Sequence, residues 1–437
     1  METTIKHTKT LSTEQFLGLP DVKKVTLPNG IDVHTLRTKI SGLSKLIIAF
    51  PAGKKNHHNP ALPDAAFSLI KKGVKGKTPG HFSEEMEQTG MICNTSVNND
   101  YSSLSAIFLE EEDTHSLQLI SEMIYQPLYD DNEIQRYIQK HIQAYEVNQQ
   151  KTTVRSREIF MQQLFGDNHS LGKIINRIHY ESIEKEVLTQ YHQQYILPTA
   201  PDIFLASGNP DRMVEAIEQY FKHQELKTTT KKTHSKNAIH GTPPTHTHLE
   251  MPQAQQTSLR IGKNLFAKAD PDYPGMELLI TLLGGYFSSR LMANLREDKG
   301  FTYGVGARII PFANTGIITI ATDIGHQYRQ QGIEEIQKEI KMLQKERIPA
   351  DELETVKRYM TGSILRSLDG AFNKLSVVAE LCQTGVDMPW VSYAYEKMRN
   401  TGSEEIMELA NKYLILDELT TVTAGKTIQN TGKNTSL

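Results

Sequence analysis

The stretch from Gly284 to Val305 reads GGYFSSRLMANLREDKGFTYGV, and it connects two kinds of predicted element. Before it, the apolar run over residues 278–283 predicts a buried helix that ends at a glycine pair. After it, residues 304–310 and 316–322 alternate in the way that predicts two strands. A similar order of elements occurs earlier in the chain, which suggests a repeat.

Two pairs of segments carry the evidence for this repeat. The short apolar helix predicted at residues 61–72 corresponds to the helix at 278–283, and their starts differ by about 213 residues. Tyr195-Ile196-Leu197 precedes a predicted strand at 203–206, and Tyr413-Leu414-Ile415 precedes another at 421–425, displaced by about 217 residues. Two independent pairs of similar segments, separated by nearly the same number of residues, predict a duplicated α+β unit.

A polar, threonine-rich stretch separates the two units. Residues 225–247 have no apolar periodicity, so they cannot bury a core and are expected to form an exposed linker. The sequence therefore predicts an N-terminal domain at 1–224 and a C-terminal domain at 248–437. Each is expected to be an α/β sandwich in which helices cover a mainly antiparallel sheet, so the fold class is α+β.

Composition excludes several classes of protein. The 437 residues include 48 Lys and Arg against 51 Asp and Glu, so there is no general basic field to attract nucleic acid. The two cysteines are too few for a disulfide framework or a cysteine-built zinc site. The longest apolar run is too short to span a membrane. We expect a cytoplasmic protein, or a periplasmic one if a signal peptide has been removed.

The opening stretch resembles a signature of the pitrilysin/insulinase (inverzincin) metallopeptidases. The resemblance lies in Ser-Arg-Leu at 289–291, Leu-Arg-Glu at 295–297 and the Gly-hydrophobic-x-Tyr string that ends at Tyr303. With the duplicated halves, it covers nearly the whole chain. It implies a two-domain fold that forms half of a clamshell-shaped peptidase chamber.

The zinc site of that family has no counterpart in this sequence. The family carries His-x-x-Glu-His on the short helix of its first domain, with a distal Glu as a further ligand. The matching helix has Asp64 and Ser68 at the histidine positions and Phe67 at the position of the general base. The region expected to supply the distal Glu reads Ile142 to Tyr145 without an acidic residue. We therefore expect no metal or other cofactor in this chain.

Other histidines give weak signals for a metal site. The sequence from His81 to Glu85 is interpreted as a helix start capped by Ser83, where the glutamates favour the positive end of the helix. His57-His58 and His246 to His248 lie in a predicted turn and in the linker, with no carboxylate at helical spacing.

By resemblance, Arg296 and Tyr303 reach from the second domain into the chamber and contact the substrate near the bond that is cleaved. A guanidinium can donate to a peptide carbonyl, and a tyrosine hydroxyl can donate to a developing oxyanion. The alternative is a purely structural Arg paired with a neighbouring acidic residue and a half-buried Tyr. Arg290 and Ser289 are lesser candidates, because a role in fixing the helix explains them equally well.

These residues predict a non-catalytic subunit that pairs with a zinc-bearing paralogue and helps to enclose extended oligopeptides. Some bacterial members of the family divide the work between two such chains. The alternative is a structural or peptide-binding module of the same fold without a role in proteolysis. An autonomous zinc peptidase with a relocated site would need ligands that the sequence does not offer. Neither interpretation excludes a homodimer.

Overall fold

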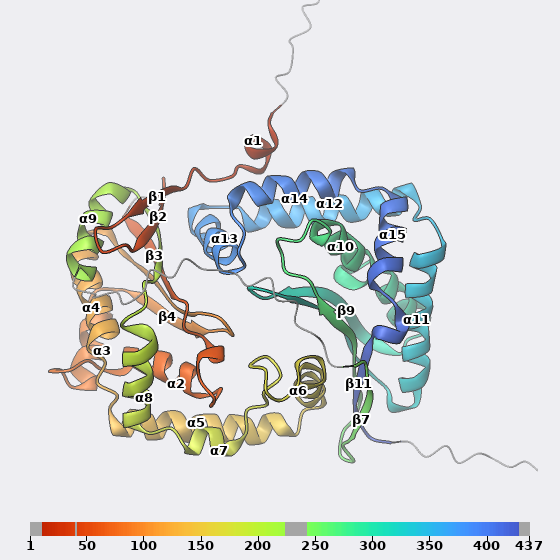
Figure 1. Cartoon of the computed structure of the whole chain (residues 1–437), viewed down its shortest axis with the longest axis horizontal. Coiled ribbons are helices and arrows are strands. Elements are labelled where there is room, and N and C mark those ends of the chain that lie inside the picture. The colour runs from red at the N-terminus through yellow and green to blue at the C-terminus, as the bar shows by residue number, and fades with distance from the viewer. Residues whose placement is uncertain (1–10, 40–41, 223–242, 428–437) are drawn as a thin grey trace, which may run out of the picture.

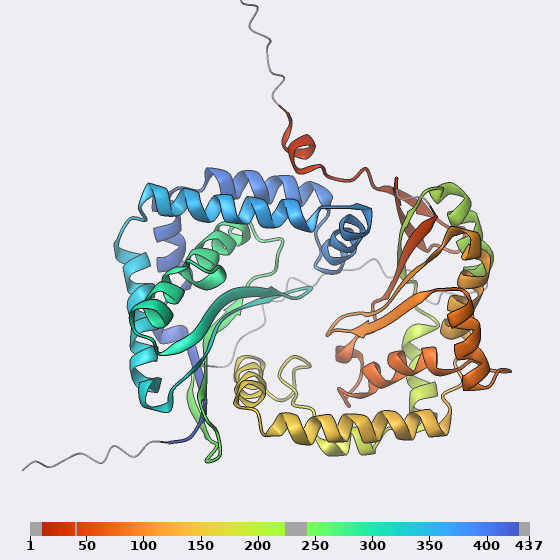
Figure 2. The same cartoon turned by 180° about the vertical axis from the view of Figure 1, so that it is seen from behind.

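The computed structural model describes residues 11–39, 42–222 and 243–427. It consists of two halves, residues 11–222 and 243–427, each built around one sheet with helices on its outer side (Figure 1). The view from behind shows the same two halves facing each other across the middle of the molecule (Figure 2).

The elements of the first half, in chain order, are α1 (Thr13–Leu17), β1 (Lys23–Thr26), β2 (Asp32–Arg37), β3 (Leu43–Phe50), η1 (Lys54–Asn56), α2 (Leu62–Leu69), η2 (Ile70–Lys72), α3 (Pro79–Gln88), β4 (Ile92–Val97), β5 (Ser102–Leu109), η3 (Glu110–Glu112), α4 (Asp113–Tyr125), α5 (Asp131–Gln149), α6 (Thr152–Phe165), α7 (Arg177–Glu181), α8 (Lys185–Tyr191), η4 (His192–Ile196), β6 (Asp202–Ser207) and α9 (Pro210–Phe221).

The elements of the second half are β7 (His246–Glu250), β8 (Thr257–Leu265), α10 (Tyr273–Ile280), η5 (Thr281–Gly285), η6 (Met292–Asp298), β9 (Thr302–Pro311), β10 (Gly316–Ile324), η7 (His326–Tyr328), α11 (Arg329–Lys345), α12 (Ala350–Ser367), α13 (Ala371–Gln383), α14 (Met388–Asn400), α15 (Ser403–Tyr413), η8 (Leu416–Glu418) and β11 (Thr420–Gly425).

The order of strands confirms the predicted duplication. Sheet 1 has the order β1-β2-β6-β3-β5-β4, and sheet 2 has the order β7-β11-β8-β10-β9. Without β1, each sheet begins with one parallel pair, β2 with β6 and β7 with β11, and continues with antiparallel pairs only. The two halves are therefore copies of one mixed, mainly antiparallel unit, and the α+β class is correct.

Each half has its own hydrophobic core between its sheet and its outer helices. In the first half, α2 and α4 pack on sheet 1 through fully buried residues such as Phe67 and Leu117. In the second half, α10 and α11 pack on sheet 2 through residues such as Leu279 and Ile336. Burial of such apolar side chains is the main source of stability for each unit.

The inner faces of the two sheets are covered by an exchange of helices between the halves. Helix α6 of the first half packs on β8 and β11 of sheet 2, and α13 of the second half packs on β6, β3 and β2 of sheet 1. Phe160 of α6 shares a buried cluster with Val422, and Leu375 of α13 shares another with Phe204. Helix α1 also crosses over, since Leu17 belongs to the core of the second half. The halves are thus interlocked.

Three expectations from the sequence differ from the structure. Helix α3 begins at Pro79 and is capped by the Thr78 side chain, because Pro suits the first turn of a helix; Ser83 lies inside the helix and is not its cap. Of the predicted linker, residues 225–242 lie outside the described residues, and His246 already pairs in β7. His246 and His248 therefore both lie in a strand of sheet 2 and not in a linker.

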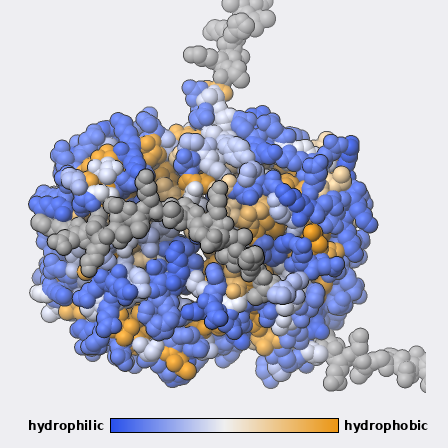
Figure 3. Space-filling model, viewed as in Figure 1, coloured by the Kyte–Doolittle hydropathy of each residue, from blue (hydrophilic) through white to orange (hydrophobic). Residues whose placement is uncertain are grey.

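No helix within the described ranges is both long and apolar enough to cross a membrane. The face of the molecule seen in Figure 3 is mostly hydrophilic, and its hydrophobic residues lie in scattered patches.

Candidate functional site

The three positions that correspond to the family's zinc motif all lie on α2. Phe67 is fully buried and meets Phe50 edge to face, with ring centroids 5.9 Å apart. Asp64 accepts a hydrogen bond from the hydroxyl of Tyr137 on α5, at 2.7 Å. Ser68 is only partly exposed. One carboxylate, one hydroxyl and a phenyl ring do not fit a zinc ion, which takes nitrogen, sulfur or carboxylate ligands in a closed set.

Aromatic side chains stand on α5 where the sequence comparison expects the distal ligand. The His141 ring stacks on Tyr137 with centroids 3.8 Å apart, and its Nδ1 donates a hydrogen bond to the Tyr137 carbonyl at 2.8 Å. Burial raises the pKa of Tyr137, and the nearby Asp64 carboxylate adds to this shift, so the phenol remains a donor. Residues 142–145 include no acidic side chain, so they offer no distal metal ligand. The contact between α2 and α5 is structural, and sequence reasoning missed both Tyr137 and His141.

The other histidines also have structural partners. His57 and His58 lie ring to ring with centroids 4.2 Å apart, and the Nζ of Lys173 donates to the His58 carbonyl. His81 lies 3.4 Å from Glu85 on the surface of α3. Within the described ranges there is no group of three or more His, Cys, Asp or Glu residues that could hold a metal ion.

Arg296 and Tyr303 both project from the second half without a fixed polar partner. Among the described residues, the Arg296 guanidinium makes no hydrogen bond or ion pair, and it lies over the ring of Phe287 at 4.9 Å from the centroid. Tyr303 is 91 % exposed at the start of the edge strand β9. The structural alternative, an Arg paired with Glu297 or Asp298 and a half-buried Tyr, does not describe this geometry.

The backbone that carries these two side chains is rigidly held. Arg296 lies in the π-helical turn η6, and turns of this kind are frequent at functional sites. Asn294 fixes η6 to α11, because its amide donates to Glu335 at 2.9 Å and to Glu339 at 2.7 Å. Glycine at 284 lets η5 approach β9, since a Cβ there would lie 2.7 Å from the Cβ of Ala307. The half-buried Arg296 and the exposed Tyr303 are therefore carried by backbone that is held in place.

Arg290 and Ser289 do not share this exposure. The Arg290 guanidinium forms a two-point pair with Glu352 of α12, with both N–O distances 2.8 Å, and its side chain is 14 % exposed. Ser289 is fully buried. Arg290 therefore ties the turn after η5 to α12, whereas the buried Ser289 hydroxyl has no hydrogen-bond partner among the described residues.

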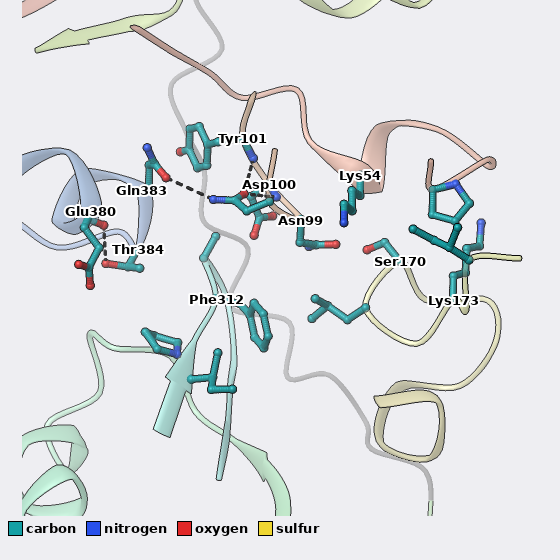
Figure 4. A pocket seen from close by; sticks show the side chains of 17 residues that line it. Lys54, Asn99, Asp100, Tyr101, Ser170, Lys173, Phe312, Glu380, Gln383 and Thr384 are labelled. Carbon is teal, nitrogen blue, oxygen red and sulfur yellow. Dashed lines mark hydrogen bonds between the residues drawn. The ribbon is translucent and has the colours of Figure 1, made fainter. Parts of the chain in front are cut away.

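A cavity of about 540 Å³ lies where the two halves meet. The loop before β5 contributes Asp100 and Tyr101, the loop after α6 contributes Lys173, the tip of the β9–β10 hairpin contributes Phe312, and α13 contributes Gln383 (Figure 4). Asn98 and Gln383 are hydrogen-bonded across the boundary between the halves at 3.3 Å. Sequence reasoning did not predict this cavity, because its walls come from five segments that are distant in the sequence, the fifth being the stretch with Lys54 and Pro60.

Helices on the outer sides of two facing sheets, a central cavity and an incomplete zinc site define the class of an inactive peptidase-like fold. The family comparison agrees. Residues 182–360, which include Arg296 and Tyr303, match the family model described as the Peptidase M16 inactive domain. Over these residues the chain is similar to that family, and the three positions that correspond to the zinc motif hold Asp64, Phe67 and Ser68.

Several known proteins are similar to the chain. The uncharacterized zinc protease YmxG of Bacillus subtilis is 26 % identical over 366 residues, which are 81 % of this chain and 86 % of that protein. The probable inactive metalloprotease YmfF of the same organism is 21 % identical and covers 68 % of this chain and 70 % of its own length. The crystal structure of a peptidase M16 inactive domain from Pseudomonas fluorescens has the same fold, with a TM-score of 0.80, 20 % identity and coverage of 93 % and 99 %.

A further relative is named as a subunit. The mitochondrial-processing peptidase subunit alpha-1 of Dictyostelium discoideum is 25 % identical over 224 residues, which are 50 % of this chain and 33 % of that protein. The chain is therefore related to peptidase subunits as well as to single-chain proteins named as proteases.

Proposed function

We propose that this chain is the non-catalytic subunit of a zinc-dependent peptidase. In this proposal it pairs with a zinc-bearing relative and supplies Arg296 and Tyr303 to extended oligopeptides bound between the two subunits. The observation that carries the proposal is that the half-buried Arg296 and the exposed Tyr303 have no polar partner among the described residues, while hydrogen bonds from Asn294 hold the turn that carries Arg296.

The chemistry of the two residues suits that role. The planar guanidinium of Arg296 offers several donors to the carbonyl groups of a peptide, and its contact with Phe287 limits the directions in which it can point. The Tyr303 hydroxyl can donate to the oxyanion that forms when water bound in the partner's site attacks the peptide bond. Zinc in the partner would supply the activated water, and this chain would supply the donors.

Cleavage of quenched fluorescent peptides tests the proposal. The full chain, a zinc-bearing M16 relative from the same genome and their mixture are compared at equal subunit concentrations. Activity is expected only in the mixture. Arg296→Ala is expected to lower kcat/KM of the mixture by roughly tenfold to a hundredfold, the effect of removing a charged donor to the peptide carbonyls. Tyr303→Phe is expected to lower kcat with a smaller change in KM.

The matched control is Arg136→Ala on α5, where the side chain is 74 % exposed and far in sequence from the site. It removes the same charge from the surface, and the mixture is expected to keep its activity. Equal activity of the wild-type and Arg296→Ala mixtures would contradict the role of the arginine. Cleavage by this chain alone would contradict the assignment as a non-catalytic subunit.

A further inference from the structure

The inner face of sheet 2 carries three arginines that the function above does not use. Arg260 of β8, Ala321 of β10 and Gly306 of β9 are direct neighbours across the sheet. Their side chains therefore point to the same face, and Arg308, two residues after Gly306, points there too. The opposite face is the hydrophobic core, since Ala307 and Ile320 are buried in it. Arg157 of α6 completes the group, which we call the arginine cluster.

The three guanidinium groups lack carboxylate partners. Among the described residues, Arg157 and Arg308 are exposed and form no ion pair or hydrogen bond. Arg260 is held under α6, where its Nε donates to the Ser156 hydroxyl at 3.3 Å. Asp323, which follows Ala321 by two residues on the same face, is the one acidic neighbour with an effect on Arg260. Three positive charges against one negative charge leave a surplus of two.

Burial and the positive charges around Arg260 both act on the pKa of its guanidinium. Burial, and then the charges of Arg157 and Arg308, lower the pKa of the Arg260 guanidinium to about 10, while Asp323 acts in the opposite direction. A bound anion would relieve this repulsion. The sheet also offers room for one, because a Cβ at Gly304 or Gly306 would meet no atom within 4 Å.

The arginine cluster is placed between the exposed Tyr303 and the central cavity. Ile310, two residues after Arg308 on the same face of β9, lines that cavity (Figure 4 shows the neighbouring Phe312). Tyr303 and Arg308 are five residues apart on one strand, or roughly 16 Å, and the regular alternation of faces is broken between them, because the register of β9 against β10 shifts between Thr302 and Val305. An extended peptide that reaches Tyr303 and follows β9 toward the cavity therefore passes the cluster.

We propose that the arginine cluster binds a carboxylate of the extended peptide, and that the chain selects acidic peptides with a Glu or Asp about five residues from the bond near Tyr303. This inference rests on the proposed function for the peptide's path. It goes beyond that function because it names the substrate class and a specificity site. A planar guanidinium is the side chain best suited to hold a carboxylate at two points.

Fluorescence polarisation with matched peptides tests the inference on the full chain. The probes are labelled decapeptides, all amidated at the C-terminus, that carry one Glu, one Gln or one Lys at the same position. The Glu peptide is expected to bind roughly tenfold more tightly than the Gln peptide at low salt, the effect of one charge-assisted contact. A free-acid version of the Gln peptide distinguishes a side-chain carboxylate from a terminal one. Either source of tighter binding supports a carboxylate site.

Charge reversal separates a specific site from a change in folding. Arg308→Glu is expected to favour the Lys peptide over the Glu peptide, because one exposed charge is inverted at the site. Arg308→Gln is expected to remove most of the preference for Glu, and the matched control Arg136→Gln to leave it unchanged. A preference for Glu that persists in Arg308→Glu and in Arg157→Gln would overturn the proposal.

The outcomes also separate this inference from the proposed function. Equal binding of Glu and Gln peptides, with both weakened by Arg296→Ala, would reject the carboxylate site and leave the peptidase subunit in place. Failure of every peptide to bind, both to the chain and to its mixture with the zinc-bearing relative, would reject both. Millimolar inorganic phosphate at constant ionic strength is expected to displace the Glu peptide from the wild type. Loss of this displacement in Arg308→Gln would support an anion site at the arginine cluster, and unchanged displacement in that variant would count against it.

Discussion

His192 is a buried histidine between α8 and β6 that the sequence did not single out. Its Nε2 is 2.7 Å from the Ile124 carbonyl, and its Nδ1 is 3.0 Å from the Tyr129 hydroxyl. Burial lowers the pKa of this imidazole to about 4, although the bond to Ile124 acts against the shift. The neutral ring is therefore part of the folded state over most of the physiological pH range.

The depressed pKa of His192 predicts a loss of stability in mild acid. Above pH 6.5 the ring is neutral in both states, so its contribution to folding is fully present. Between pH 6.5 and 4 the unfolded chain takes up a proton that the folded chain refuses, and the free energy of unfolding falls by about 3 kcal/mol in total. Below pH 4 both states are protonated and the fall ends.

Urea unfolding of the wild type and His192→Gln across pH 4 to 7.5 measures this effect. The variant is expected to be less stable at pH 7 but to lose less stability on acidification, so that the two curves converge. His81→Gln, which removes a surface imidazole, is the control and should keep the wild-type slope. Parallel curves for the wild type and His192→Gln would show that the ring is protonated in the fold.

Single residues also show where sequence reasoning could succeed. Loss of the zinc ligands was predictable, because Asp64, Phe67 and Ser68 occupy a motif with fixed spacing. The partners that replaced the metal were not, because Tyr137 lies 73 positions from Asp64 and only the fold brings them together. The acidic run at residues 110–113 would be read from the sequence as a solvated turn before a helix. In the structure, Glu110 accepts from the Gly208 amide at 2.7 Å, and Asp113 is buried against Arg212.

At the level of the element, the position of Tyr303 depends on how closely η5 approaches β9. A Cβ at residue 284 would lie 2.7 Å from the Ala307 Cβ and 2.8 Å from its backbone nitrogen, which cannot move independently of the strand. Gly284→Ala is therefore expected to push β9 away from η5, to cost about 2 kcal/mol of stability and to weaken cooperation with the zinc-bearing relative.

Gly306→Ala is the matched control for stability, since it lies on the same strand and its Cβ would meet no atom within 4 Å. Alanine loses less chain entropy than glycine on folding, so this change is expected to be neutral or slightly stabilising. Thermal unfolding of the two variants makes the comparison. Equal melting temperatures would mean that η5 and β9 tolerate separation.

Helices with one apolar face were predictable from periodicity. Apolar residues at helical spacing predict helices over residues 133–149 and 332–346 and from residue 350 onward, and α5, α11 and α12 lie close to these ranges. Helix α6 was not predicted. Its buried residues, such as Phe160 and Leu164, cover the sheet of the other half, so no neighbouring strand in the sequence indicates where they pack. Strand β4 was also missed, because an edge strand with mostly polar residues gives a weak signal.

For the whole molecule, the exchange of α6 and α13 predicts that a destabilising substitution in one half also destabilises the sheet of the other half. Leu375 of α13 is fully buried against sheet 1, and Phe160 of α6 is buried against sheet 2. Leu375→Ala is expected to cost about 3 kcal/mol and to lower hydrogen-exchange protection in β3 and β6. Phe160→Ala is expected to do the same in β8 and β11.

Native-state hydrogen exchange followed by mass spectrometry locates these losses. Leu279→Ala, in the core of the second half, is the control, because it removes the same side chain from an element that packs on its own sheet. It is expected to lower protection mainly in the second half. Losses confined to the half that contains each substitution would show that the two sheets are stabilised independently.

The exchange of helices also has a consequence for the synthesis of the chain. Sheet 1 is complete when Ser207 leaves the ribosome, but α13, which covers its inner face, begins only at Ala371. At about 5 to 20 residues per second, the delay is roughly 10 to 30 seconds. During that time α13 does not yet cover the apolar surface around Phe204. We therefore expect the nascent chain to bind chaperones at the ribosomal exit.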